Sequence, residues 1–249
     1  MGLLDFLSKD GRKASALKKN VARALNKHMQ SMDRMRALEA LAEDNSPEAT
    51  YGLLRRYSYV YDKTIEDEQE KHWVEETLVA KGKQILPMLR KYLTDAESIA
   101  WPLRILGQVA SAEEIEEALA ALCRENEPGY ARDPSKKIQM LRYIHEHDAS
   151  GAQGTLDVLV PYLADMDEGV RFAVVNCLLE KKDERAAAPL LEHFLKPEEE
   201  SGRIRIRIAE GFADLGWNVP KAQVEAVSRL LASQFSIDKS GKISRRTVG

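Results

Sequence analysis

The chain has 249 residues, of which 44% are apolar, 31% are charged and only 6% are aromatic. This composition is typical of a globular protein with a charged surface, and the abundance of Ala, Leu, Glu, Lys and Arg favours helix. The net charge of −3 argues against a general nucleic-acid binder, which normally carries a basic excess. No stretch of 18 apolar residues occurs, so the sequence predicts no transmembrane helix.

The charge is concentrated at one end of the chain. Residues 1–30 hold seven Lys or Arg against two Asp, about +5, which leaves about −8 for the remainder. Leu17, Val21 and Leu25 recur at four-residue spacing opposite a basic side, so residues 14–29 are predicted to form a basic amphipathic helix. We expect this helix either to cap the fold or to bind a membrane or a partner, with the apolar residues 1–7 as an extra anchor or a mobile arm.

The stretch "SGRIRIRIAEGFADLGW", residues 201–217, begins with the Ile–Arg alternation of a strand. However, it matches "VRFAVVNCLLEKKD" at residues 170–183, at an offset of 34 residues, in its order of β-branched, small and large apolar positions. In that register Ile204, Ile208 and Phe212 fall near one helical face. The sequence therefore predicts a helix over Gly202–Leu215, ended by Gly216.

The same register continues upstream more weakly, in segments that open at Lys136, Ser98, Glu70 and Asp33. An apolar helical segment precedes or separates these blocks, which gives about six helix pairs. Because one pair cannot bury its apolar face alone, repeated pairs of this kind stack against their neighbours.

The turn "VPYLADMDEGVR" carries a resemblance to the HEAT repeat family, including its bacterial short-repeat members. The matching residues are Pro161-Tyr162-Leu163, Asp165 and Val170-Arg171, and the resemblance is strong over residues 153–217 and weaker over the rest of residues 31–235. It implies an all-α fold, an α-solenoid of about six helix pairs in a right-handed superhelix. It also implies that the second helix of each pair lines a concave face, and that Asp165 and Arg171 form a structural ion pair across the turn.

This gives three regions: a basic amphipathic N-terminal region over residues 1–30, the solenoid over 31–235, and a basic, flexible tail over 236–249. The fourth and seventh positions of each second helix adjoin on one face. If the solenoid is regular, this face binds the partner, because Trp and Arg dominate binding hot spots. The predicted binding residues are Trp73, Trp101, Arg104, Gln139, Arg142, Asn176 and Arg207. The two tryptophans and the arginines 104 and 142 are expected to meet in its middle. The alternative is that both tryptophans pack between helices.

The sequence shows no signature of catalysis or of a cofactor. Five scattered histidines define no triad, and the glycines form no phosphate-binding loop. In "HEHD", residues 145–148, histidines two apart point to different sides of a helix, which is poor spacing for a metal. The acidic run "TIEDEQEK", residues 64–71, is interpreted as solvated and as suited to a helix N-terminus. Cys123 and Cys177 lie in apolar helical patterns and are interpreted as reduced thiols.

The leading hypothesis is thus a cytoplasmic, non-catalytic scaffold or adaptor that binds a protein or peptide on the concave face. A second hypothesis is a HEAT-like nucleic-acid-binding protein or DNA-repair-type enzyme. A third is a peripheral membrane or assembly factor that acts through residues 1–29. The identity of the partner and the oligomeric state are left open by the sequence.

Overall fold

The computed structural model describes residues 9–147 and 151–246, which are mostly helical. The α-helices are α1 (Lys9–Ala24), α2 (Ser31–Glu43), α3 (Pro47–Leu54), α4 (Thr64–Lys81), α5 (Leu86–Asp95), α6 (Ala100–Val109), α7 (Ala112–Glu125), α8 (Ser135–Glu146), α9 (Gly151–Leu159), α10 (Glu168–Glu180), α11 (Ala187–Leu195), α12 (Gly202–Leu215) and α13 (Val224–Leu230). Short 3-10 helices are η1 (Arg55–Ser58), η2 (Gly82–Ile85), η3 (Val160–Ala164), η4 (Glu184–Ala186) and η5 (Lys221–Gln223). The strands are β1 (Phe235–Ile237) and β2 (Ile243–Arg245). The predicted all-α class is confirmed, apart from this hairpin.

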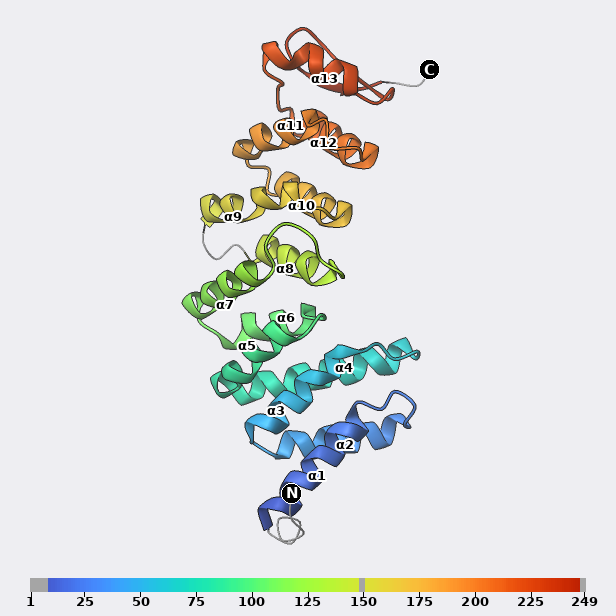
Figure 1. Ribbon diagram of the computed structural model, residues 1–249, viewed down its shortest axis with the longest axis vertical. Coiled ribbons are helices and arrows are strands. Elements are labelled where there is room, and N and C mark those ends of the chain that lie inside the picture. The colour runs from blue at the N-terminus through green and yellow to red at the C-terminus, as the bar shows by residue number, and fades with distance from the viewer. Residues whose placement is uncertain (1–8, 148–150, 247–249) are drawn as a thin grey trace. The chain divides into compact units, whose positions relative to one another are not determined.

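The chain divides into two units, Met1–Glu125 and Asn126–Gly249. In the first unit, α2, α4 and α6 contact one another in chain order, and so do α3, α5 and α7, so that the helices form two rows (Figure 1). Leucines from both rows fill the core between them, among them Leu38, Leu53, Leu78 and Leu106, each fully buried.

In the second unit, α8, α10 and α12 contact one another in the same way, while α11 lies against α12 and α13 (Figure 1). Its core is built from aliphatic and aromatic side chains such as Val174, Leu190, Phe194 and Phe212, each at most 2% exposed. In both units, therefore, alternate helices of the chain lie side by side.

Helix α12 has the bounds that the sequence predicts, Gly202–Leu215. The Ser201 hydroxyl accepts a hydrogen bond from the Ile204 N–H and so caps the N-terminus, and Gly216 ends the helix in the left-handed region at φ 69°. Ile204, Ile208 and Phe212 are at most 1% exposed. The alternating start is therefore a helix, because its buried residues follow the helical period.

Helix α1 begins earlier than predicted, at Lys9, and ends at Ala24, so that Lys27 lies in the turns beyond it. It packs against α2 and α3. The approach to α3 is close, because a Cβ on Gly52 would lie 2.8 Å from Cγ2 of Val21. Residues 1–7, the predicted anchor or arm, fall outside the described residues.

The prediction of a flexible tail is wrong for residues 236–246. β1 and β2 form an antiparallel hairpin, with Ser236 opposite Ser244. Phe235 and Ile243 are buried, and β2 contacts α12. The turn requires Gly241, whose φ is +92° and whose Cβ would meet the main chain at 2.0 Å. The strands were not predicted because the segment is mostly polar and basic. The hairpin packs through the buried residues Phe235 and Ile243. Residues 247–249 lie outside the described part.

Candidate functional site

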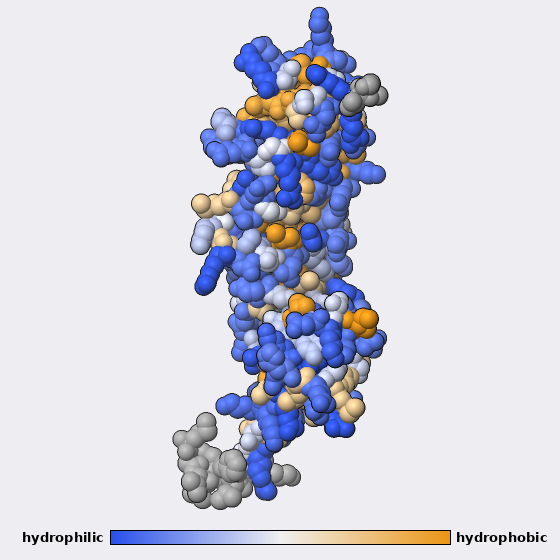
Figure 2. All heavy atoms as spheres, turned by 90° about the vertical axis from the view of Figure 1, so that its right-hand side faces the viewer, coloured by the Kyte–Doolittle hydropathy of each residue, from blue (hydrophilic) through white to orange (hydrophobic). Residues whose placement is uncertain are grey.

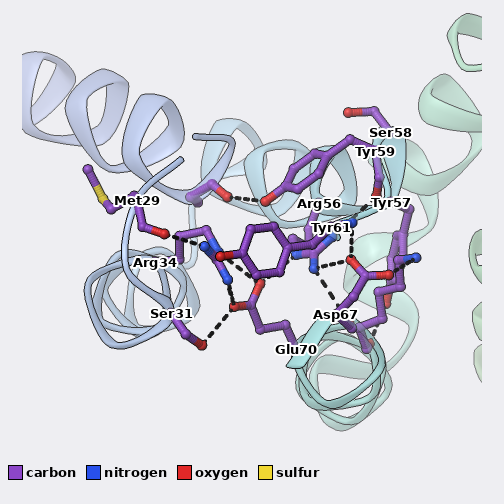
Figure 3. A network of polar contacts seen from close by, with 12 residues as sticks. Met29, Ser31, Arg34, Arg56, Tyr57, Ser58, Tyr59, Tyr61, Asp67 and Glu70 are labelled. Carbon is purple, nitrogen blue, oxygen red and sulfur yellow. Dashed lines mark hydrogen bonds and ion pairs between the residues drawn. The ribbon is translucent and has the colours of Figure 1, made fainter. Parts of the chain in front are cut away.

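A cluster of buried charges joins α2, η1 and α4 in the first unit (Figure 3). Arg34 Nη2 donates to Glu70 Oε1 at 2.6 Å, and Arg56 Nε donates to Glu70 Oε2 at 2.9 Å. Arg56 Nη2 also donates to Asp67 Oδ1 at 2.6 Å, and Lys71 Nζ donates to Asp67 Oδ2 at 2.5 Å. These five residues are at most 6% exposed. We call Arg34, Arg56, Asp67, Glu70 and Lys71 the buried charge cluster.

Tyrosines surround this cluster. The Tyr61 ring lies 4.0 Å from the Arg34 guanidinium, and the Tyr59 hydroxyl donates to the carbonyl oxygen of Ala24 at 2.8 Å. The Tyr59 ring lies 4.5 Å from the Arg56 guanidinium, so Tyr59 links the end of α1 to the cluster on α2, η1 and α4. Burial would raise the pKa of Asp67, but hydrogen bonds from Lys71 and Arg56 outweigh it and lower that pKa. A carboxylate saturated with donors in this way is a poor general base, so the cluster fastens helices.

The sequence interpretation of residues 64–71 as a solvated acidic run is therefore wrong for three of its members. Asp67, Glu70 and Lys71 are 1%, 4% and 6% exposed. The interpretation as a helix N-terminus holds, since α4 begins at Thr64 with Glu66 and Asp67 in its first turn.

A second cluster lies on the α4–α6 face, around Trp101, which is half-buried. Its ring stacks on Tyr57 at a centroid distance of 5.7 Å, and the His72 ring meets it edge-on at 4.8 Å. The Arg104 guanidinium lies 4.5 Å from the Trp101 ring and also pairs with Glu75 at 3.2 Å. Trp101 is thus packed on one side and carries a half-exposed cation on the other.

The structure brings only part of the predicted site together here. Trp101 and Arg104 are adjacent, as predicted. The α4 ring against Trp101 is that of His72, one residue before Trp73. Trp73 is half-buried on α4. Arg142, predicted to join these residues, belongs to the second unit.

In the second unit, α8, α10 and the start of α12 line a groove with a volume of about 600 Å³. Its walls carry two exposed arginines, Arg142 and Arg203, with Asn176 and Phe172 between them on α10. The Arg203 guanidinium lies 3.6 Å from the Phe172 ring. We call this the α8–α10 groove.

Of the remaining predicted residues, Arg207 contacts a residue of the groove, and Gln139 makes a contact within its own helix. Arg207 Nε donates to the side-chain oxygen of Asn176 at 2.7 Å, and Arg207 also lies 3.9 Å from Glu210. Gln139 Nε2 donates to the carbonyl oxygen of Ser135 within α8. The positions chosen by register on α8, α10 and α12 therefore adjoin through Arg142, Asn176 and Arg207.

The expected ion pair of Asp165 with Arg171 takes a different form. Arg171 Nη1 donates to the main-chain carbonyl of Asp165 at 2.9 Å, while its ion pair is with Glu199 at 2.8 Å. The Asp165 carboxylate instead pairs with buried Lys137 at 2.8 Å. The physical reason is that a buried carboxylate needs a buried cation, and Lys137 is 4% exposed. The turn is still fastened, but by two ion pairs to other segments.

Groups with catalytic potential are held in structural contacts. His145 of "HEHD" pairs with Glu180 at 2.8 Å, and His147 stacks on Tyr143 at 3.9 Å. Within residues 9–147 and 151–246, no group of three or more His, Cys, Asp or Glu is placed to hold a metal ion. Cys123 and Cys177 are both reduced, and burial raises the pKa of Cys177 to about 12, which makes that thiol a poor nucleophile.

On the face drawn in Figure 2, hydrophilic side chains predominate and apolar ones occur in separate groups. The exposed large apolar residues come from distant parts of the chain, for example Val60, Tyr130 and Met166. In the described part of the chain, no helix combines the length and the apolar character needed to cross a bilayer. Comparison of the chain with protein-family models, with curated proteins and with solved structures gave no match.

Proposed function

We propose that the chain is a non-catalytic adaptor of the HEAT-like class. In this proposal it is an α-solenoid of about six helix pairs, wound as a right-handed superhelix, and its partner is a protein or peptide. Its two reduced cysteines favour a reducing compartment, which supports the cytoplasm as its location. Scattering in solution tests the superhelix, because a globule of 249 residues has a radius of gyration of about 18 Å and a solenoid a larger one.

The α8–α10 groove is the observation that carries the proposal. Its volume of about 600 Å³ suits a few side chains of an extended peptide rather than a whole domain. Among the described residues, no hydrogen bond or ion pair holds the exposed Arg142 guanidinium, and Arg203 rests only on the Phe172 ring. Unpaired arginines beside an aromatic ring are typical of binding hot spots.

The charges of the groove define the chemistry of its occupant. Besides the two arginines, the groove is lined by the acidic side chains of Glu146 and Glu180, and Glu180 contacts His145 Nε2 at 2.8 Å. Arg142 and Arg203 remain to receive carboxylates, which arginine binds through two parallel hydrogen bonds. We therefore propose a partner segment that combines acidic residues with an apolar side chain placed near Phe172.

In this proposal the α4–α6 face offers a further contact surface of the same character. Trp101 and Arg104 present an aromatic ring and a half-exposed cation there. However, Glu75 already compensates Arg104, so this surface contributes less charge to an acidic partner.

Selection from a random peptide display library on the immobilised full chain tests the proposal. We expect the enriched peptides to be acidic, with at least one large apolar residue. A synthetic peptide from this set should bind in fluorescence anisotropy, and the double substitution Arg142→Ala/Arg203→Ala should weaken its binding at least tenfold.

Arg132→Ala is the matched control, because Arg132 is exposed in the same unit and does not line the groove. It should leave the affinity for the peptide unchanged. Enrichment without acidic residues, or equal binding by the double variant, would refute the proposed site.

A further inference from the structure

Helix α1 and the turns that follow it carry exposed cations. Between residues 11 and 30 the sequence holds six Lys or Arg and no Asp or Glu. All six are exposed: Arg12, Lys13, Lys18, Lys19, Arg23 and Lys27. Lys13 lies 3.7 Å from Asp44, and this is the ion pair that the structure records for the six cations. The segment is thus strongly positive in a chain whose net charge is negative.

The apolar side of α1 packs against other helices of the first unit. Leu17 and Val21 are half-buried and Ala24 is fully buried, in a helix that packs against α2 and α3. Consequently α1 does not act as a free amphipathic helix that inserts its apolar face into a bilayer. Any further ligand of α1 meets its cationic side.

Three of these cations form a narrow stripe along the exposed side of α1. Arg12, Lys19 and Arg23 are spaced at i, i+7 and i+11, which places them on one stripe of the helix, opposite the docked side. The stripe is about 16 Å long at the helical rise of 1.5 Å per residue. Between these cations lie small exposed residues, Ala16 and Ala22, so that a flat surface can approach the helix closely.

We propose that this stripe docks the protein on an anionic lipid surface. Basic side chains near such a surface each contribute about fivefold to the binding constant. The proposal is independent of the adaptor function.

A nucleic acid offers the same negative charge but fits the surface less well. Single-stranded nucleic acids bind through aromatic side chains on which bases stack. Residues 9–50, which contain α1 and α2, include no Phe, Tyr or Trp. A short straight stripe with small residues between its cations matches a plane rather than a groove.

Vesicle flotation with the full chain tests the proposal. Vesicles of phosphatidylcholine with 30% phosphatidylglycerol should bind the protein, pure phosphatidylcholine should not, and binding should fall steeply between 50 and 300 mM salt. The variant Lys19→Gln/Arg23→Gln should weaken binding about 25-fold, two factors of about five. Both side chains are exposed and glutamine is a good helix former, so the fold should persist.

The control Lys221→Gln/Lys239→Gln removes the same charge from exposed positions in the second unit and should leave vesicle binding unchanged. Circular dichroism verifies that both variants fold. Equal flotation of the α1 variant and the control would overturn the proposal, and so would equal binding to neutral vesicles. Tighter binding of a 20-base-pair duplex, which then displaces the vesicles, would assign the stripe to nucleic acid instead.

Discussion

Removal of the buried Glu70 carboxylate should lower the free energy of unfolding more than a substitution at an exposed position of the same helix, α4. Glu70 accepts hydrogen bonds from Arg34, Arg56 and Ser31, and it is 4% exposed. In Glu70→Ala, Arg56 keeps Asp67 as a partner, but Arg34 keeps only the carbonyl oxygen of Met29 and the Tyr61 ring. A fully buried guanidinium is then left without a counter-charge.

Breaking a buried ion pair by removal of one partner costs about 3–5 kcal/mol of the free energy of unfolding. We expect this loss in urea unfolding followed by circular dichroism at 222 nm. Hydrogen exchange should locate it, with faster exchange in α2 and α4. Glu70→Gln should lose less, because the amide oxygen still accepts a hydrogen bond from one arginine.

Glu68→Ala is the matched control, since Glu68 lies on the same helix and is exposed. It should change the free energy of unfolding by about 0.5 kcal/mol or less. If Glu70→Ala and Glu68→Ala differ by no more than this amount, the buried charge cluster does not hold α2 to α4 and the reasoning fails.

Three further predictions follow from local geometry. Gly211→Ala should lower the free energy of unfolding by about 1–3 kcal/mol, because the new Cβ would lie 2.2 Å from Leu179 Cδ2. Gly202→Ala is the control, because a Cβ there meets open space, and it should leave the same urea titration nearly unchanged. The stability contribution of the Asp67 carboxylate is complete above its unfolded pKa of about 3.9 and is lost as the pH falls through its lowered folded pKa. Acid unfolding of Asp67→Asn should therefore depend less on pH in that window. Gly241→Ala should release the β1–β2 hairpin, seen as loss of amide protection in β1 and β2 with the helices still protected. Retained protection in both strands would contradict the close approach at this turn.

The sequence predicts α12 to the residue because its buried positions are apolar and its ends carry strong local signals. Gly216 ends the helix through its own backbone conformation, so this signal can be read from the sequence alone. Ser201 caps the start through an equally local hydrogen bond, although the prediction did not use it. The hairpin was missed because its stability is not local. Two short strands are marginal alone, and β1 and β2 depend on the surfaces of α12 and α13.

Helix α4 shows why the candidate site was only partly predictable. Its buried face consists of positions 67, 70, 71, 74, 75 and 78, which is a regular helical stripe. Four of these six residues are charged, so hydropathy reveals only Val74 and Leu78. Two apolar residues are too few to determine which side of α4 faces its neighbours. The register therefore selected Trp73 as the residue beside Trp101, whereas the structure places His72 there.

In the second unit, the register of apolar residues correctly predicted which residues adjoin. The buried charges there lie outside the central turns of the helices. Asp165 and Glu199 lie in the turns before α10 and α12, and Lys137 lies in the first turn of α8. The central turns of α8, α10 and α12 thus keep apolar residues on their buried side, among them Leu141, Val174 and Ile208. When the buried side is apolar, its register also fixes the opposite side, and so Arg142 and Asn176 line one groove. The α8–α10 groove was therefore predictable because its helices bury apolar residues in their central turns. The α4–α6 face was not, because α4 buries charged residues along its length.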